Sequence, residues 1–577
     1  MRTKCLVCFM SLLFLWACDG TFSTIIETKY GEVKGFLDAD NTLAWKGIPY
    51  AKPPVDELRW KAPADPEPWD GMLDATEDCD ECSQMTLMPP PEKYIGNEDC
   101  LYLNIWRPQS MSCNLPVYFW IHGGGNTNGT AKNFNGSVLA SRSNMVVVSI
   151  QYRLGPLGWL SHAALRHSEN PLDDSGNFGT LDTIKALEWV RDNIRAFGGN
   201  PHNVLIAGQS AGAHNVLNLV ISPLANGLFH KAISQSNFMK TCTVDYGDEL
   251  AESMIANLLA EDGLSEVPGG DVEGYLRGKV AEELLVARYT AIIEARAASD
   301  LMRQERGFQD GFVIPDGGVI PTIESGNYNK VPVIVGSTED EMKFVLPNWG
   351  LFLKNVYLDP ESGIDVPIPS SDYTWVDLLV GLLFGSPALD DVLPTDDDKT
   401  LYQACAEFGS LNIRYNFLDA IARSLKEQQD EVYSYLFKWD GIEGSDYDFI
   451  YGAVHGMDIP FFFGGDTDLW GGIAFSPEND TLGRQALSEA MMKYVANFAC
   501  TGNPSSIFLP SGLPVWRKWS NREGEPKVIV FDATETDIDI GMISEEITSD
   551  DVDAKFSYWY STLPAEVRNL LNIFDWF

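Results

Sequence analysis

Several short apolar runs along the chain have the pattern of strands that are buried on both faces. Each is rich in Val, Ile or aromatic residues, and polar residues hardly interrupt it. The runs are Pro116–Ile121, Met145–Ile150, Val204–Ala207 and Val331–Val335. Because both faces of such strands need cover, we expect a largely parallel sheet with helices on its two sides.

A helical pattern lies between the second and third of these runs. From Leu181 to Ala196, apolar residues recur at about helical spacing, and Gly198-Gly199 follows as a stop. Alternating strands and helices predict an α/β fold. No internal repeat or low-complexity linker divides the chain. We therefore expect one domain over residues 21–577, with a large, mostly parallel central sheet flanked by helices and with helical insertions.

Composition narrows the classes of protein that the chain can be. It has 577 residues, of which 45% are hydrophobic, so it is not a disordered chain. Its 82 acidic and 41 basic residues give a net charge of −41, which argues against binding nucleic acid or an anionic membrane surface. Three classes of protein stay open: a soluble enzyme, a receptor for cations, and a protein adapted to high salt. We expect the acidic clusters Asp396–Asp398 and Glu545–Asp553 to be solvated surface loops.

Residues 1–20 have the features of a signal peptide. Arg2 and Lys4 precede the apolar run Cys5–Ala17, whose 13 residues are fewer than the roughly 20 that span a bilayer. No other apolar run has spanning length, so we predict no transmembrane helix and an exported chain, secreted or periplasmic. Two cleavages are open: an ordinary one near Ala17–Gly20, or a lipoprotein type that leaves Cys18 as a lipid anchor.

The cysteines favour disulfides over a metal site. An exported chain permits disulfides, and Cys79-Asp80-Glu81-Cys82 has no second CxxC pair to complete a zinc site. Seven cysteines follow Cys18, so at least one is free or pairs with Cys18 or another chain. They are Cys79, Cys82, Cys100, Cys113, Cys242, Cys405 and Cys500.

The chemistry of the chain begins at Ser210. Gly208-Gln209-Ser210-Ala211-Gly212 is a G-x-S-x-G sequence that directly follows an apolar strand and precedes the helix-compatible run Ala211–Ile221. This context is typical of a nucleophile elbow, in which a serine sits on a tight turn between strand and helix. The helix N-terminus then brings backbone N–H groups close to the reacting oxygen.

A serine nucleophile needs a base, and elimination among seven histidines leaves one. In α/β hydrolases the order along the chain is Ser, acid, His. His455, between Gly452 and Gly456 in a glycine-flanked loop, is the candidate base. The others precede Ser210 or follow it too closely to leave room for an acid-bearing strand: His122, His162, His167, His202, His214 and His230.

The acid is expected just after the strand Val331–Val335, because catalytic groups sit at the carboxyl ends of strands in such sheets. Glu339, Asp340 and Glu341 all stand there, and spacing alone does not choose among them.

An oxyanion site is predicted at the glycine run His122-Gly123-Gly124-Gly125, which also follows a strand. Three glycines let backbone N–H groups face a developing alkoxide without obstruction by side chains.

Taken together and in order, these segments resemble the type-B carboxylesterases, the family that includes the cholinesterases. The resemblance runs from about Thr28 to beyond Pro514. Besides the segments around Ser210 and His122, it is carried by Gly47–Ala51 with Pro53-Pro54, Glu98–Asn104, Tyr152–Gly155, Phe197–Pro201 and His455–Phe461.

The resemblance implies an α/β-hydrolase fold and a serine carboxylesterase that cleaves small-molecule esters through an acyl-enzyme. It selects Glu341 as the acid and assigns the oxyanion donors to Gly124, Gly125 and Ala211. It also implies a disulfide between Cys82 and Cys100. No cofactor or metal is implied, and the oligomeric state stays open.

Departures from the family pattern bear on the substrate. Cholinesterases have an acidic residue before the nucleophile, where this chain has Gln209, and a choline-binding Trp that is missing between Cys82 and Cys100. Gln209 resembles the GQSAG form of insect juvenile hormone esterases, although Asp182-Thr183 replaces their Asp-Gln pair. The alternatives are therefore a choline-ester or juvenile-hormone-type esterase, or a neuroligin-like adhesion protein, whose members typically lose triad residues.

Overall fold

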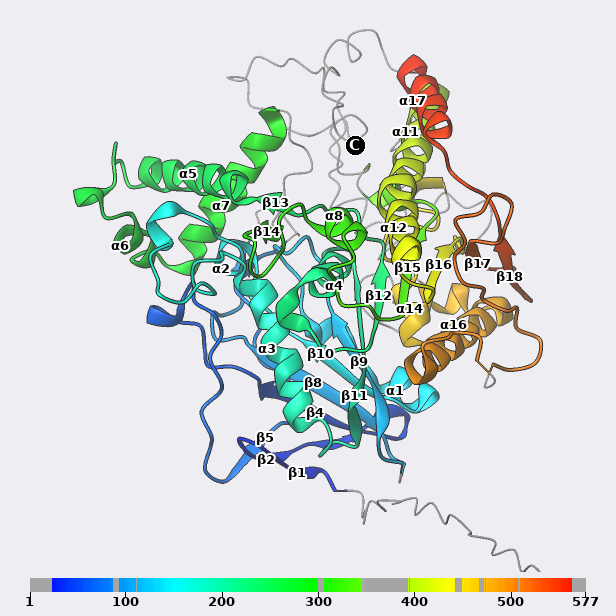
Figure 1. The fold of residues 1–577 in the computed structure, drawn as a ribbon, viewed down its shortest axis with the longest axis horizontal. Helices are drawn as coiled ribbons and strands as arrows, with labels where there is room; N and C mark the ends of the chain where they lie inside the picture. The colour runs from blue at the N-terminus through cyan, green and yellow to red at the C-terminus, as the bar shows by residue number, and fades with distance from the viewer. Residues whose placement is uncertain are drawn as a thin grey trace, which may run out of the picture.

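The computed structural model describes residues 23–86, 93–110, 112–298, 306–344, 395–441, 449–465, 474–506 and 509–562, together with 346, 393 and 472 (Figure 1). The expected signal peptide and Cys18 lie outside these residues. Among the helices that are described, none combines the length and apolar character needed to cross a membrane.

An 11-stranded mixed sheet forms the centre of the molecule, in the order β18-β17-β16-β15-β12-β11-β9-β10-β8-β4-β3. The strands from β17 to β10 in this order run parallel. They are β9 (Leu115–Ile121), β10 (Val146–Ile150), β11 (Gly199–Gln209), β12 (Lys231–Gln235), β15 (Val333–Thr338), β16 (Val432–Phe437) and β17 (Val528–Ala533). Antiparallel strands complete the edges: β3 (Phe36–Asp38), β4 (Thr42–Pro49), β8 (Tyr102–Pro108) and β18 (Ile538–Ile543).

Each of the four predicted apolar runs lies in a parallel strand of this sheet, which confirms the predicted α/β architecture. The run predicted at Val331–Val335 starts later, at Val333, because Pro332 has no N–H to donate to a neighbouring strand.

The helix predicted over Leu181–Ala196 forms earlier, as α3 (Phe178–Asn193). Gly199 does not simply end it, but begins β11. A Cβ atom at Gly199 would lie 2.8 Å from Ile194 Cγ1 and 2.9 Å from Val117 Cγ2. The glycine is therefore required by close packing between helix and sheet.

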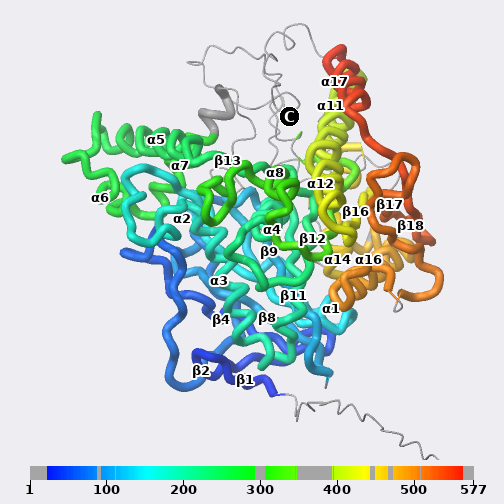
Figure 2. The backbone as a smooth tube through the Cα atoms, viewed as in Figure 1, coloured from blue at the N-terminus to red at the C-terminus, as the bar shows by residue number. Residues whose placement is uncertain are grey.

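Helices cover both faces of the sheet, and alternate residues of each strand enter two separate cores. In β9, Val117 and Phe119 enter the core beneath α3, whereas Tyr118 and Trp120 enter the other one. The first face carries α3, α4 (Ala211–Ile221) and α12 (Ala420–Gln428). The second carries α1 (Ser137–Ser143), α14 (Ile459–Phe463) and α16 (Leu482–Thr501) (Figure 2).

Smaller elements surround this three-layer core. On one side lie α5 (Val244–Glu261), α6 (Val272–Arg277) and α7 (Ala281–Ala298), and on the other α11 (Asp396–Ile413) and α17 (Ser549–Thr562) (Figure 1). The other strands and α-helices of the described residues are β1 (Ile25–Thr28), β2 (Gly31–Lys34), β5 (Met72–Asp74), β6 (Gln84–Met85), β7 (Tyr94–Ile95), β13 (Cys242–Thr243), β14 (Phe308–Gln309), α2 (Gly155–Gly158) and α8 (Val319–Glu324).

The prediction that the acidic clusters are loops was wrong for most of their residues. Asp396–Asp398 form the first turn of α11, where Thr395 and Asp398 make a reciprocal capping box. Asp550 and Asp551 lie in the first turn of α17, and Asp551 accepts from the backbone N–H of Thr548. Carboxylates at these positions satisfy free N–H groups and oppose the positive end of the helix dipole.

A disulfide joins Cys82 and Cys100, the pair implied by the family resemblance. It closes the loop that contains β6 (Gln84–Met85) and β7 (Tyr94–Ile95), just before β8. Cys79, Cys405 and Cys500 are free thiols.

Candidate active site

Ser210 occupies a strained turn between β11 and α4, with φ 59° and ψ −124°. Such a conformation is rare for a residue with a side chain and persists only where surrounding structure enforces it. A Cβ atom at Gly212 would lie 2.1 Å from Ile121 O, and one at Gly208 would lie 2.5 Å from Gly212 O. The two glycines thus let strand and helix touch, and this contact holds the serine at the turn.

The glycine run lies directly beside the serine. A Cβ atom at Gly123 would lie 3.1 Å from Ser210 Cβ. Gly124 and Gly125 have φ values of 109° and 63°, which favour glycine. Within the described part of the chain, no hydrogen bond engages the backbone N–H of Gly124, Gly125 or Ala211. Three backbone donors are therefore available close to Ser210.

The three consecutive carboxylates after β15 have three different partners. Glu339 is exposed and forms an ion pair with Lys438. Asp340 Oδ2 accepts from the N–H of Ala453 at 3.2 Å, and its own N–H donates to Ala453 O at 3.0 Å. Glu341, in the short 3₁₀ helix Glu341–Phe344, faces inward, and its Oε2 accepts from His455 Nδ1.

Glu341 is fully buried yet ionises readily. Burial opposes its charge, but the nearby imidazole of His455 and the backbone N–H of Thr338 outweigh burial and lower the pKa of the carboxyl. Its Oε1 accepts from Thr338 N at 2.7 Å and from Ser337 Oγ at 3.0 Å. These contacts fix the carboxylate in one orientation toward the imidazole.

His455 lies in the loop after β16, and the Asp340–Ala453 hydrogen bonds hold this loop against the end of β15. The rings of Phe238 and Phe344 flank the imidazole, with centroids 5.0 Å and 5.5 Å from it. Ser210, Glu341 and His455, which sequence reasoning had proposed separately, are thereby gathered at the carboxyl ends of β11, β15 and β16.

Sequence reasoning missed the partner of the other ring nitrogen. His455 Nε2 lies 2.9 Å from Gln209 Nε2, and among the described residues Ser210 Oγ makes no hydrogen bond to His455. The sequence had marked Gln209 only as a departure from the cholinesterases.

A second buried carboxyl near the site was also missed. Asp458 is fully buried, and its Oδ2 accepts from Tyr435 Oη at 2.5 Å, while its Oδ1 has no hydrogen-bond partner in the described part of the chain. Burial, reinforced by the charge of Glu341, raises the pKa of Asp458 to about 7. The only sequence signal was its place three residues after His455.

Replacing Asp458 by Asn is expected to change how stability depends on pH. A carboxyl whose folded pKa exceeds its unfolded pKa holds extra protons in the native state, so the native state loses stability as pH rises between about 4 and 7. Asn cannot titrate. The free energy of unfolding of Asp458→Asn, relative to the parent protein, should therefore increase from pH 5 to pH 8 by about 1–4 kcal/mol, measured by denaturant titration.

Asp430→Asn is the matched control for this prediction. The ion pairs of Asp430 with Lys426 and Lys518 lower the pKa of its carboxyl to about 2, so its charge is constant from pH 5 to pH 8. Its effect on stability should be the same at both pH values. If the free energy of unfolding of Asp458→Asn, relative to the parent protein, is also the same at pH 5 and pH 8, Asp458 does not titrate in this range.

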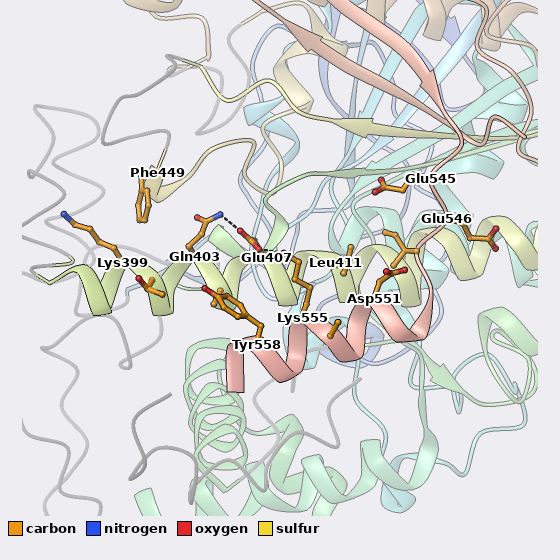
Figure 3. Close-up of a pocket in the computed structure, with 14 residues that line it drawn as sticks. Lys399, Gln403, Glu407, Leu411, Phe449, Glu545, Glu546, Asp551, Lys555 and Tyr558 are labelled. Carbon is orange, nitrogen blue, oxygen red and sulfur yellow. Dashed lines mark hydrogen bonds and ion pairs between the residues drawn. The ribbon is translucent and has the colours of Figure 1, made fainter. Parts of the chain in front are cut away.

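A cavity of about 880 Å³ lies elsewhere, between α11 and α17 (Figure 3). Successive turns of α11 contribute Lys399, Gln403, Glu407 and Leu411, and α17 contributes Asp551, Lys555 and Tyr558. Ser210, Glu341 and His455 do not line this cavity, so it is not part of the candidate active site. Within the described residues, no group of three or more His, Cys, Asp or Glu side chains is arranged to hold a metal ion.

Comparisons with known proteins show which family the chain resembles over most of its length. The sequence profile of the carboxylesterase family matches residues 23–547. A para-nitrobenzyl esterase of Bacillus subtilis is 32% identical over 492 residues, which cover 84% of this chain and 91% of that protein. The human cocaine esterase is 33% identical over 560 residues, covering 90% of this chain and 91% of that enzyme.

Solved structures show the same fold. A PNB esterase superposes with a TM-score of 0.67 at 28% identity, covering 94% of this chain and all of the other (100%). A carboxylesterase of Geobacillus stearothermophilus gives a TM-score of 0.66 at 26% identity, with 93% of this chain and 100% of that one covered.

Proposed function

The chain belongs to the carboxylesterase family and is a carboxylic ester hydrolase, and we propose that Ser210, His455 and Glu341 are its catalytic triad. The observation that carries this proposal is that a strained serine, a buried imidazole and a carboxylate bonded to that imidazole lie at the carboxyl ends of β11, β15 and β16. The free N–H groups of Gly124, Gly125 and Ala211 support their role as the oxyanion hole.

The first half of the reaction forms an acyl-enzyme. Ser210 Oγ attacks the ester carbonyl carbon while His455 Nε2 takes the hydroxyl proton. Glu341 accepts from Nδ1–H, so it fixes the tautomer that leaves Nε2 bare and then stabilises the imidazolium. The backbone N–H groups bind the oxyanion of the tetrahedral intermediate. His455 returns the proton to the leaving alcohol.

The second half releases the acid. A water molecule gives a proton to His455 Nε2 and attacks the acyl carbon. As the second tetrahedral intermediate collapses, His455 returns this proton to Ser210 Oγ, which releases the acid and regenerates the enzyme. No step needs a metal or cofactor. A neutral Gln209 beside the serine favours neutral esters over the cationic choline esters, because it offers no negative charge to an ammonium group.

We also propose that the enzyme is exported and that residues 21–577 act as one catalytic domain. The basic residues and short apolar run at the N-terminus support export, as does the Cys82–Cys100 disulfide. Strands from Phe36 to Ile543 share one sheet, which supports a single domain. Mass analysis of the mature N-terminus distinguishes ordinary cleavage from a lipidated Cys18.

A fluorophosphonate probe tests the assignment of the nucleophile. The probe should label the purified enzyme once, and peptide mass analysis should place the label on Ser210. Hydrolysis of a series of p-nitrophenyl esters should stop in proportion to labelling. Full turnover in labelled enzyme, or a label on another residue, would contradict the proposed triad.

A further inference from the structure

Gln209 reaches from the glycine run to the imidazole. Its side chain is buried, and a Cβ atom at Gly123 would lie 3.1 Å from its Oε1. Its Nε2 lies 2.9 Å from His455 Nε2. The amide thus lies at Nε2 of the imidazole, the atom that takes the proton of Ser210 in the proposed mechanism.

The direction of this hydrogen bond is set by the other side of the ring. Glu341 Oε1 accepts from the N–H of Thr338 and the hydroxyl of Ser337, and its Oε2 lies against His455 Nδ1, so the carboxylate accepts from Nδ1–H of the imidazole. Nε2 of the neutral imidazole then has no hydrogen and can only accept. The amide N–H of Gln209 must be the donor.

We propose that Gln209 is a positioning residue that caps Nε2 of His455 in the free enzyme and must release it before the base can accept the proton of Ser210. The inference rests on the proposed triad. It explains why, in this state, His455 Nε2 bonds to the amide and Ser210 Oγ makes no hydrogen bond to the imidazole in the described part of the chain.

Capping links the protonation of His455 to the rate. An imidazolium carries a hydrogen on Nε2 and cannot accept from the amide, so Gln209 stabilises the neutral form alone. If a fraction of the neutral enzyme is capped, the plateau of kcat/KM at high pH falls by some factor, and the apparent acid pKa falls by the decimal logarithm of that factor. Well below that pKa, the rate is independent of capping. Among the described residues, the ionisable groups near the imidazole include Glu341 and Asp458, and Tyr435 donates a hydrogen bond to Asp458.

Gln209→Met tests the cap, because Met has similar length and no N–H to donate. A neutral hydrogen bond of typical strength predicts a plateau kcat/KM about 3- to 10-fold higher. The apparent acid pKa should rise by the matching amount, about 0.5 to 1 pH unit. At low pH the profiles of variant and parent should coincide. The measurement is kcat/KM for a p-nitrophenyl ester from pH 4 to pH 9, repeated as the rate constant of fluorophosphonate labelling.

Two further variants complete the test. Gln209→Glu keeps the size of the side chain but adds a negative charge, which should raise the acid pKa by 1 unit or more, about the usual effect of an opposite charge at this range. Gln428→Met, the same exchange at the end of α12, should leave the whole profile unchanged.

The outcomes separate the cap from the triad. A Gln209→Met profile that is unchanged, or lowered equally at every pH, overturns the cap while labelling of Ser210 still stands. Loss of labelling at Ser210 in the parent enzyme overturns the triad itself. If Gln209→Met does not fold, Gln209→Glu carries the test, and an unshifted acid limb in that variant overturns the cap.

Discussion

Ser210→Ala should lower kcat for p-nitrophenyl ester hydrolysis by about 10⁴- to 10⁶-fold, the range seen when a serine nucleophile is removed from a triad. Ala has no oxygen with which to form an acyl-enzyme, so only the backbone donors and substrate binding remain to assist attack by water. The expected residual rate is therefore small but above the uncatalysed one. Steady-state kinetics with active-site titration of the parent enzyme measures the loss.

Ser222→Ala makes the same chemical change at the far end of α4. Ser222 is fully buried, and its hydroxyl has no hydrogen-bond partner in the part of the chain that the structure describes. Its replacement should keep full activity and serve as the control for folding. Ester turnover of Ser210→Ala equal to that of Ser222→Ala would rule out Ser210 as the nucleophile.

Glu341→Gln should lower kcat by about 10³- to 10⁴-fold without unfolding the enzyme, as is typical when the acid of a triad becomes an amide. The amide can donate to Nδ1, which favours the tautomer with its hydrogen on Nε2. That tautomer cannot take the proton of Ser210. The amide also removes the negative charge that stabilises the imidazolium. Because the effect is on the chemical step, KM should change much less than kcat.

Glu339→Gln is the matched control, two residues earlier in the chain. Its side chain is exposed and paired with Lys438, so activity should stay within about twofold of the parent, since exposed ion pairs contribute little. If Glu339→Gln were inactive and Glu341→Gln active, the acid would be misassigned. The pair of variants thus tests the choice that spacing alone left open.

The sequence was sufficient to predict the sheet and two residues of the candidate site, Ser210 and His455. Runs of apolar residues predicted the parallel strands, and the strand–glycine–serine–glycine–helix order predicted the turn at Ser210. His455 emerged by elimination because the chain has few histidines. These features depend on residues close together in sequence, or on a small number of candidates.

The acid and its surroundings could not be derived from local pattern. Glu339, Asp340 and Glu341 are neighbours in the chain but face solvent, the adjacent loop and the imidazole, and only the fold sets these directions. The family resemblance, not spacing, selected Glu341. The Gln209–His455 contact joins residues 246 positions apart, and nothing near either residue in the sequence indicates it.

Local pattern also failed for the acidic clusters. Runs of aspartate suggest solvated loops, yet Asp396–Asp398 start a helix because Thr395 caps it and the apolar residues of that helix lie further along the chain. The start of a helix depends on its cap and on the apolar residues of its later turns, so charge alone was a poor guide.

The wide separation of the site residues along the chain determines when activity appears during synthesis. A nascent chain that has emerged to Val335 already contains the nucleophile and the glycine run, but neither Glu341 nor His455. The base becomes available only after β16 has emerged, and β17 must still join the sheet beside it. Chains that end before His455, including those that lack the C-terminal third, have no base and therefore cannot hydrolyse esters by the proposed route.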